Sequence, residues 1–271
     1  MTETRSRSRK EANLKREFLS LLAPAGACML CLACAASAQW LDIKLPGIPR
    51  LADGKPNLRA PAPRTADGKP DLSGVWRAAD GKWLASLAVD EGQAPLQPWA
   101  AALYKERVAA DGKDRPSGRC LPHAVPDNMM VRSGPFKIIQ TPGVVVLLFE
   151  EMNHFRQVFT DGRSLPAVKE PTWLGYSVGK WEGDTLVVET AGFNDRSWLD
   201  NPGLPHTEAM RVTERFTRRD FGRLDIKITI DDPKAYTRPW SANAVFELTP
   251  DTELLESICE NERDHAHIVG K

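Results

Sequence analysis

The sequence has no excess of charge of either sign. Its 271 residues contain 36 lysines and arginines and 36 aspartates and glutamates. The first 38 residues hold six of the basic and three of the acidic residues, so the rest holds 30 basic and 33 acidic residues, a net charge of −3. Proteins that bind nucleic acid or anionic membranes need a basic stripe or cluster, which is missing. We therefore expect no nucleic-acid partner and no stable membrane insertion of the mature chain.

The common catalytic signatures are also missing. The sequence has no Gly-x-Ser-x-Gly, His-Glu-x-x-His or Gly-x-Gly-x-x-Gly motif and no phosphate loop. This leaves seryl-hydrolase, zincin and nucleotide-dependent functions without support. We expect no cofactor and no metal site.

Cysteine is scarce outside the N-terminus. Three of the five cysteines, Cys28, Cys31 and Cys34, lie in the first 38 residues, and only Cys120 and Cys259 follow. An even number of cysteines in an exported domain is typical of a disulfide. We predict a Cys120–Cys259 disulfide; two unrelated buried thiols are the alternative.

The N-terminus has the three parts of a signal peptide. Basic residues end at Lys15-Arg16, an apolar stretch covers 18–36, and Ala36-Ser37-Ala38 offers small residues for cleavage before Gln39. We predict cleavage near Ala38 and a periplasmic or secreted mature protein. Two alternatives stay open, a retained membrane anchor and a lipoprotein acylated at Cys34.

The mature chain divides into an arm and one domain. Residues 39–70 are rich in proline, which excludes helix and central strand and predicts an extended arm on the surface. The sequence Ala-Asp-Gly-Lys-Pro occurs there twice, at 52–56 and 66–70, and is typical of turns. Residues 71–271 form the predicted domain. It begins with a helix from Pro98 to about residue 110, which would bury a face containing Trp99, Leu103 and Ala110.

Short strands separated by turns dominate the rest of the domain. They are predicted over 136–141, 144–151, 155–160, 176–181, 185–190, 210–217, 224–231, 243–248 and 253–259. Strict alternation is clearest from Leu224 to Asp231, where every second residue is apolar. The pattern predicts a mostly-β fold, an antiparallel meander closed into a lipocalin-like barrel or half-barrel.

Successive side chains of a strand point to opposite sides, and this alternation, here called strand parity, yields the first candidate site. Met210, Val212, Glu214 and Phe216 share one side of their strand, so Glu214 should face the interior. A buried carboxylate has to be paired, hydrogen-bonded or protonated. It could be a catalytic acid or base beside ligand-binding Met210 and Phe216, or it could form an ion pair with an inward arginine.

Residues 191–207 supply the other candidates. His206 and Glu208 are two residues apart and could lie on one side of the barrel mouth as a proton-transfer pair, or as a solvated pair at the rim. The connection is longer than a hairpin needs and could form a lid. Asn194, Asp195 and Trp198 would then contact a ligand, although a tryptophan there could equally pack the loop down.

Two resemblances bear on the fold. The segment Trp181-Glu182-Gly183-Asp184 resembles a hairpin of lipocalin-like and fatty-acid-binding barrels. A wider set of motifs resembles a large, mostly uncharacterised family of exported bacterial proteins: 70–76, 159–163, 192–195, 211–215, Asp232-Pro233, Tyr236 and Pro239-Trp240. That resemblance implies export and a β-rich fold, and it brings no ligand or reaction.

Three functions follow as hypotheses. The first is a periplasmic, lipocalin-like protein that binds a small, largely apolar molecule. The second is a cofactor-independent lyase, isomerase or hydrolase that uses Glu214, His206 and Glu208 in the same cavity. The third is an envelope-associated structural or interaction protein.

Overall fold

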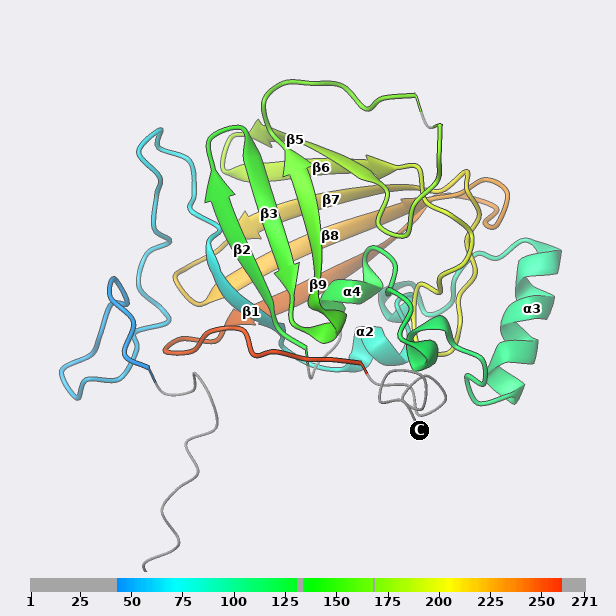
Figure 1. Cartoon of the computed structure of the whole chain (residues 1–271), viewed down its shortest axis with the longest axis horizontal. Coiled ribbons are helices and arrows are strands. Elements are labelled where there is room, and N and C mark those ends of the chain that lie inside the picture. Colours follow the sequence, from blue (N-terminus) through cyan, green and yellow to red (C-terminus); the bar gives the residue numbers. More distant parts are fainter. Residues whose placement is uncertain (1–42, 131–133, 168, 260–271) are drawn as a thin grey trace, which may run out of the picture. The chain divides into compact units, whose positions relative to one another are not determined.

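Nine β-strands follow one another around a closed barrel in the computed structural model, which describes residues 43–130, 134–167 and 169–259 (Figure 1). The strands are β1 (Gly74–Ala78), β2 (Phe136–Thr141), β3 (Val144–Phe149), β4 (His154–Phe159), β5 (Tyr176–Glu182), β6 (Thr185–Ala191), β7 (Arg211–Arg218), β8 (Arg223–Asp231) and β9 (Trp240–Leu248). β1 and β9 pair and close the ring. The predicted mostly-β barrel is confirmed. The predicted signal peptide and its cleavage site lie outside the described residues.

The apolar side of each strand faces the interior. In β8, the side chains of Leu224, Ile226, Ile228 and Ile230 are all buried, as their alternation predicts. Branched side chains of this kind favour the extended backbone. Burying each one stabilises the fold by about 1.5–3 kcal/mol.

Aromatic side chains from β1, β2, β3 and β9 also pack in the hydrophobic core. Phe136 of β2 packs edge-to-face on Phe246 of β9 at a centroid distance of 5.3 Å, and Phe149 of β3 lies 6.1 Å from Phe136. Trp76 of β1 is buried among them, and its Nε1 donates to the Leu72 carbonyl at 2.9 Å. The barrel axis is therefore occupied by packed side chains, as in other small barrels.

Eight predicted strands are present with ends within three residues of the prediction, and two details of the prediction are wrong. Residues 253–259 form no strand; they run over the surface, and Ile258 is 67% exposed. The ninth strand is instead β1, a short segment that follows the proline-rich arm. The neighbouring prolines and glycines are typical of turns, so the local sequence does not indicate a strand there.

The seam between β4 and β5 departs from the predicted antiparallel meander. These two strands are parallel, and they pair only at Val158 with Ser177 and at Phe159 with Val178. The other neighbouring strands in the ring pair antiparallel. Gly179 makes the close approach possible, because a Cβ there would lie 2.9 Å from the Val158 side chain. The seam is the weakest ladder of the barrel.

The helices are not part of the barrel wall, and the last α-helix is buried against the hydrophobic core. They are α2 (Lys82–Ala85), α3 (Pro98–Ala109), α4 (Asp127–Met130) and the short 3-10 turns η1 (Val89–Glu91), η2 (Pro116–Arg119) and η3 (Glu151–Asn153). α3 starts at Pro98 as predicted, but its predicted buried face is wrong. Ala100 is buried, whereas Ala110 is exposed and Trp99 is 47% exposed with its Nε1 bound to the Lys234 carbonyl. No helix among the described residues is long and apolar enough to cross a membrane.

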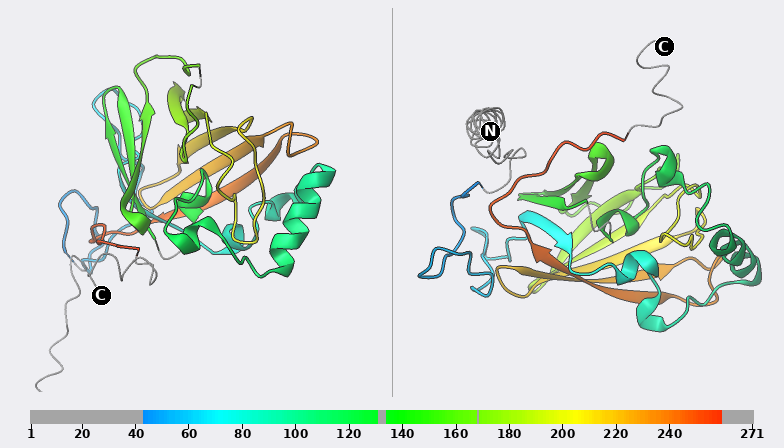
Figure 2. Two further views of the ribbon diagram at one scale, coloured as in Figure 1. Left: turned by 45° about the vertical axis from the view of Figure 1, so that its right-hand side comes forward. Right: turned by 90° about the horizontal axis from the view of Figure 1, so that it is seen from below.

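The proline-rich arm folds into two similar turns at the end of the barrel away from α3 (Figures 1 and 2). Arg50 donates to the Gly54 carbonyl, and Arg64 donates in the same way to the Gly68 carbonyl. Each arginine also forms an ion pair with the domain, Arg50 with Asp251 at 2.7 Å and Arg64 with Asp184 at 2.6 Å. An arginine two residues before each copy of the repeat therefore anchors the arm, at two points in all.

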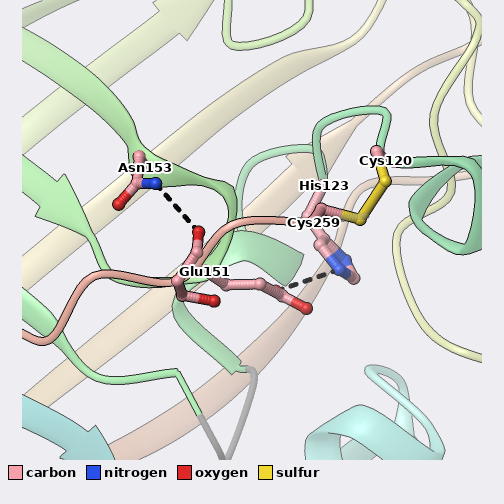
Figure 3. Close-up of a disulfide and its surroundings, with 6 residues drawn as sticks. Cys120, His123, Glu151, Asn153 and Cys259 are labelled. Atoms are coloured by element: carbon pink, nitrogen blue, oxygen red, sulfur yellow. Dashed lines mark hydrogen bonds and ion pairs between the residues drawn. A yellow bond between two sulfur atoms is a disulfide. The ribbon is translucent and has the colours of Figure 1, made fainter. Parts of the chain in front are cut away.

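The predicted disulfide is confirmed. Cys120 and Cys259 are bonded, with their Cα atoms 5.5 Å apart. The bond ties the segment after η2 to the C-terminal end of the described chain (Figure 3). Such bonds are typical of proteins outside the cytoplasm.

Candidate functional site

Glu214 lies inside the barrel, where strand parity places it. The residue is 0% exposed, and it sits between Val188 of β6 and Ile228 of β8. Arg156 of β4, whose side chain is 2% exposed, forms a bidentate ion pair with it: Nη1 donates to Oε1 at 3.1 Å, and Nη2 donates to Oε2. The ion-pair interpretation of Glu214 is confirmed.

Arg156 also binds two hydroxyl groups. Its Nε donates to Ser177 Oγ at 2.9 Å and its Nη2 to Thr190 Oγ1 at 2.7 Å, while the two hydroxyls lie 3.0 Å apart. The four residues come from β4, β5, β6 and β7, so this network crosses the weak seam. It offers no exposed carboxylate surface to a substrate, and its evident effect is to hold the barrel closed.

His206 and Glu208 do not form the predicted pair. His206 is 4% exposed; its Nε2 lies 2.8 Å from Ser197 Oγ, and burial lowers its pKa. Glu208 is exposed. The chain turns here instead of running extended, because Asp232 binds the N–H and hydroxyl of Thr207 and the Met210 N–H returns to the Thr207 carbonyl. Because the backbone is not extended here, residues two positions apart, such as His206 and Glu208, need not point to the same side.

The predicted lid residues are not gathered around a hollow. Trp198 is buried, with the Arg107 guanidinium 4.5 Å from its ring centroid, so it packs the segment against α3. Asn194 is half-buried and its side-chain oxygen accepts the Arg196 N–H, whereas Asp195 is exposed. Met210 and Phe216, predicted to contact a ligand, are both buried in the hydrophobic core.

Asp200 is a buried carboxylate in the same segment, which the sequence places in the candidate lid without indicating its buried role. It accepts the N–H groups of Leu87, Gly203 and Leu204 at 3.2, 2.9 and 2.9 Å. Burial raises its pKa to about 6, and the three N–H donors act against that rise. It joins the segment after α2 to the 199–204 turn. The sequence Asp-x-Pro-Gly at 200–203, which is typical of turns, could have indicated this turn.

A second charged cluster surrounds His123 near the disulfide (Figure 3). His123 Nδ1 is bound by Asp127 of α4, and its Nε2 lies 3.1 Å from Glu151 Oε2. Burial disfavours the charged imidazole, but the two carboxylates outweigh burial and raise its pKa to about 10. Next to it, the buried Asn128 amide has no hydrogen-bond partner among the described residues and lines a hollow of about 10 Å³, room for one water molecule.

The His123 cluster should make stability depend on pH. The folded-state pKa lies above the unfolded value of 6.5, so the contribution of His123 is complete below pH 6.5 and is lost as the pH rises toward 10. We expect the free energy of unfolding of the native chain to fall more between pH 6.5 and pH 10 than that of a His123→Gln variant. Urea titrations across this range would measure both, and parallel pH profiles would contradict the assignment.

Larger hollows lie outside the barrel wall. One of about 390 Å³ lies over β7, β8 and β9 and is lined mainly by charged and polar side chains. The outer groove, about 460 Å³, runs between residues 160–165 and the outward side of β5 and β6, and charged residues line it: Arg163, Lys180, Glu182 and Glu189. Another, which we name the arm hollow, has about 330 Å³ and lies between the arm and the end of the barrel. Its walls are mainly apolar and include Leu45, Pro46, Ile48, Val75, Phe221 and Leu248.

The chain matches no protein-family model, no curated protein and no solved structure. Among the described residues, no three His, Cys, Asp or Glu side chains are placed to hold a metal ion.

Proposed function

We propose that this protein binds a small, largely apolar molecule in the arm hollow after export to the periplasm or the cell exterior. The observation that carries the proposal is the hollow itself. Its 330 Å³ falls within the usual range for ligand pockets, about 300–1,000 Å³, and its apolar walls with a few polar groups are typical of such sites.

The arrangement of the arm supports this location. Leu45 and Ile48 belong to the arm, whereas Val75 and Leu248 belong to β1 and β9. The Arg50–Asp251 ion pair and the bond from the Leu45 N–H to Asp251 fix the arm over the barrel end. The site would thus form between the arm and the wall rather than inside a lipocalin-like interior, which aromatic side chains occupy.

Acid–base catalysis receives less support. Glu214 is enclosed and paired with Arg156, while His206 and Glu208 face different surroundings. These side chains do not share a hollow in which a substrate could meet them.

Binding can be tested with N-phenyl-1-naphthylamine, a neutral probe that fluoresces in apolar surroundings. Ile48→Asp places a charge in the wall of the hollow, and because desolvating a charge is costly we expect at least a roughly tenfold loss of probe affinity. Leu51→Asp is the matched control, since Leu51 is on the arm, is exposed and does not line the hollow. Equal probe binding by the Ile48→Asp variant and the native chain would refute the location.

A further inference from the structure

Arg218 brings a buried positive charge to the wall of the arm hollow. The residue ends β7 and is buried. Its guanidinium lies 4.9 Å from the Trp76 ring centroid and 5.2 Å from that of Phe221. Burial lowers its pKa to about 10, which leaves it charged at neutral pH.

The hydrogen-bond partners of Arg218 are all neutral backbone carbonyls. Its Nε donates to the Asp220 carbonyl at 3.2 Å, its Nη1 to the Asp71 and Ser73 carbonyls at 2.6 and 3.1 Å, and its Nη2 to the Phe221 carbonyl. A guanidinium has five N–H groups, so one on Nη2 remains available. Within the described ranges, Arg218 has no ion pair with a carboxylate.

The other charges at the hollow are already engaged. Lys137 and Glu253 pair with each other. The Asp71 carboxylate accepts the Ser73 N–H at 2.9 Å. Arg218 is therefore the charged group of this wall that is held in place by several bonds and, in the part of the chain that the structure describes, forms no direct ion pair. The Asp71 and Asp220 carboxylates interact with its charge without binding the guanidinium. A buried charge of this kind is stabilised by an anion that reaches it.

We propose that the molecule bound in the arm hollow is a small amphipathic acid, whose carboxylate faces Arg218 and whose hydrocarbon part packs on Ile48, Val75 and Leu248. The inference rests on the proposed function and adds the chemical class of the ligand. Rigid placement of the guanidinium by four carbonyls lowers the entropic cost of binding the acid.

Octanoate and 1-octanol, which have the same chain length, test the proposal by displacing N-phenyl-1-naphthylamine from the full chain at neutral pH. We expect octanoate to displace the probe at roughly tenfold lower concentration, the effect of one charge-assisted hydrogen bond. In Arg218→Met, octanoate should become no better than octanol. Equal displacement by the two compounds in the native chain would overturn the inference and leave the proposed function standing, whereas failure of the probe to bind would overturn both.

Asp71→Asn provides a second variant that leaves Arg218 in place, since Arg218 also holds four carbonyls and its loss could unfold the chain. Asparagine keeps an oxygen for the Ser73 N–H and removes one negative charge from the wall. We expect octanoate affinity to rise roughly fivefold, as for a charge interaction near a protein surface, with octanol affinity unchanged. No change for octanoate would contradict the acidic ligand.

Discussion

Replacing Glu214 with alanine is expected to lower the free energy of unfolding by roughly 3–5 kcal/mol, because it leaves the buried charge of Arg156 without its partner. The two side chains are 2% and 0% exposed, so water cannot replace the lost carboxylate without entering the barrel. The loss falls at the seam where β4 and β5 pair at only two positions. Urea unfolding, followed by tryptophan fluorescence, would measure the change.

The matched control replaces both partners with residues of similar volume. In an Arg156→Met, Glu214→Met double variant, no charge is left buried, so stability should return to within about 1–2 kcal/mol of the native chain or exceed it. If the double variant lost as much as Glu214→Ala, packing or the Ser177 and Thr190 hydroxyls would be responsible instead. A loss below about 1 kcal/mol in Glu214→Ala would mean that water reaches the site.

The sequence is sufficient to place Glu214 inside the barrel but not to find its partner. In β7 and β8 the apolar residues alternate cleanly, and parity alone decides which side is buried. In β4 the pattern misleads, because Phe155 is 61% exposed while Arg156 points inward. Local hydrophobicity favours the opposite orientation, and only partners from three other strands make an inward arginine favourable.

The candidate residues before β7 show a second limit of parity. An expectation based on alternation holds only while the backbone stays extended. The turn at Thr207 is set by Asp232, 25 positions further along the chain, which no local pattern reveals. Parity therefore assigns His206 and Glu208 to one side although they lie in different surroundings.

The arm hollow lies beyond sequence-based prediction for a similar reason. The repeated turns are recognisable from Ala-Asp-Gly-Lys-Pro, but the carboxylates that anchor them, Asp251 and Asp184, are distant in sequence. Arg218 belongs to a strand whose parity predicts an inward side chain. It lines the hollow only because it lies at the end of β7, where the arm covers it.

Removing the disulfide is expected to produce the other large effect. The bond joins residues 139 positions apart, and closing so long a loop in the unfolded chain corresponds to about 5 kcal/mol in the chain-entropy model. A Cys120→Ser, Cys259→Ser double variant should lose up to this amount, since native strain and residual structure reduce the figure. Unfolding of the variant and of the native chain in urea, without reductant, measures the difference.

Reductant separates the cross-link from the serine substitutions. The native chain with reductant should unfold at the same urea concentration as the double variant, and reductant should leave the double variant unchanged. Beyond the disulfide, the 253–259 segment is held by few bonds, among them Asn153 to the Ser257 carbonyl and the Leu255 N–H to Glu150. If the double variant lost less than about 1 kcal/mol, the bond would restrain this segment alone. A loss of several kcal/mol would instead show that it constrains the unfolded chain as a whole, because these surface contacts are too few to account for it.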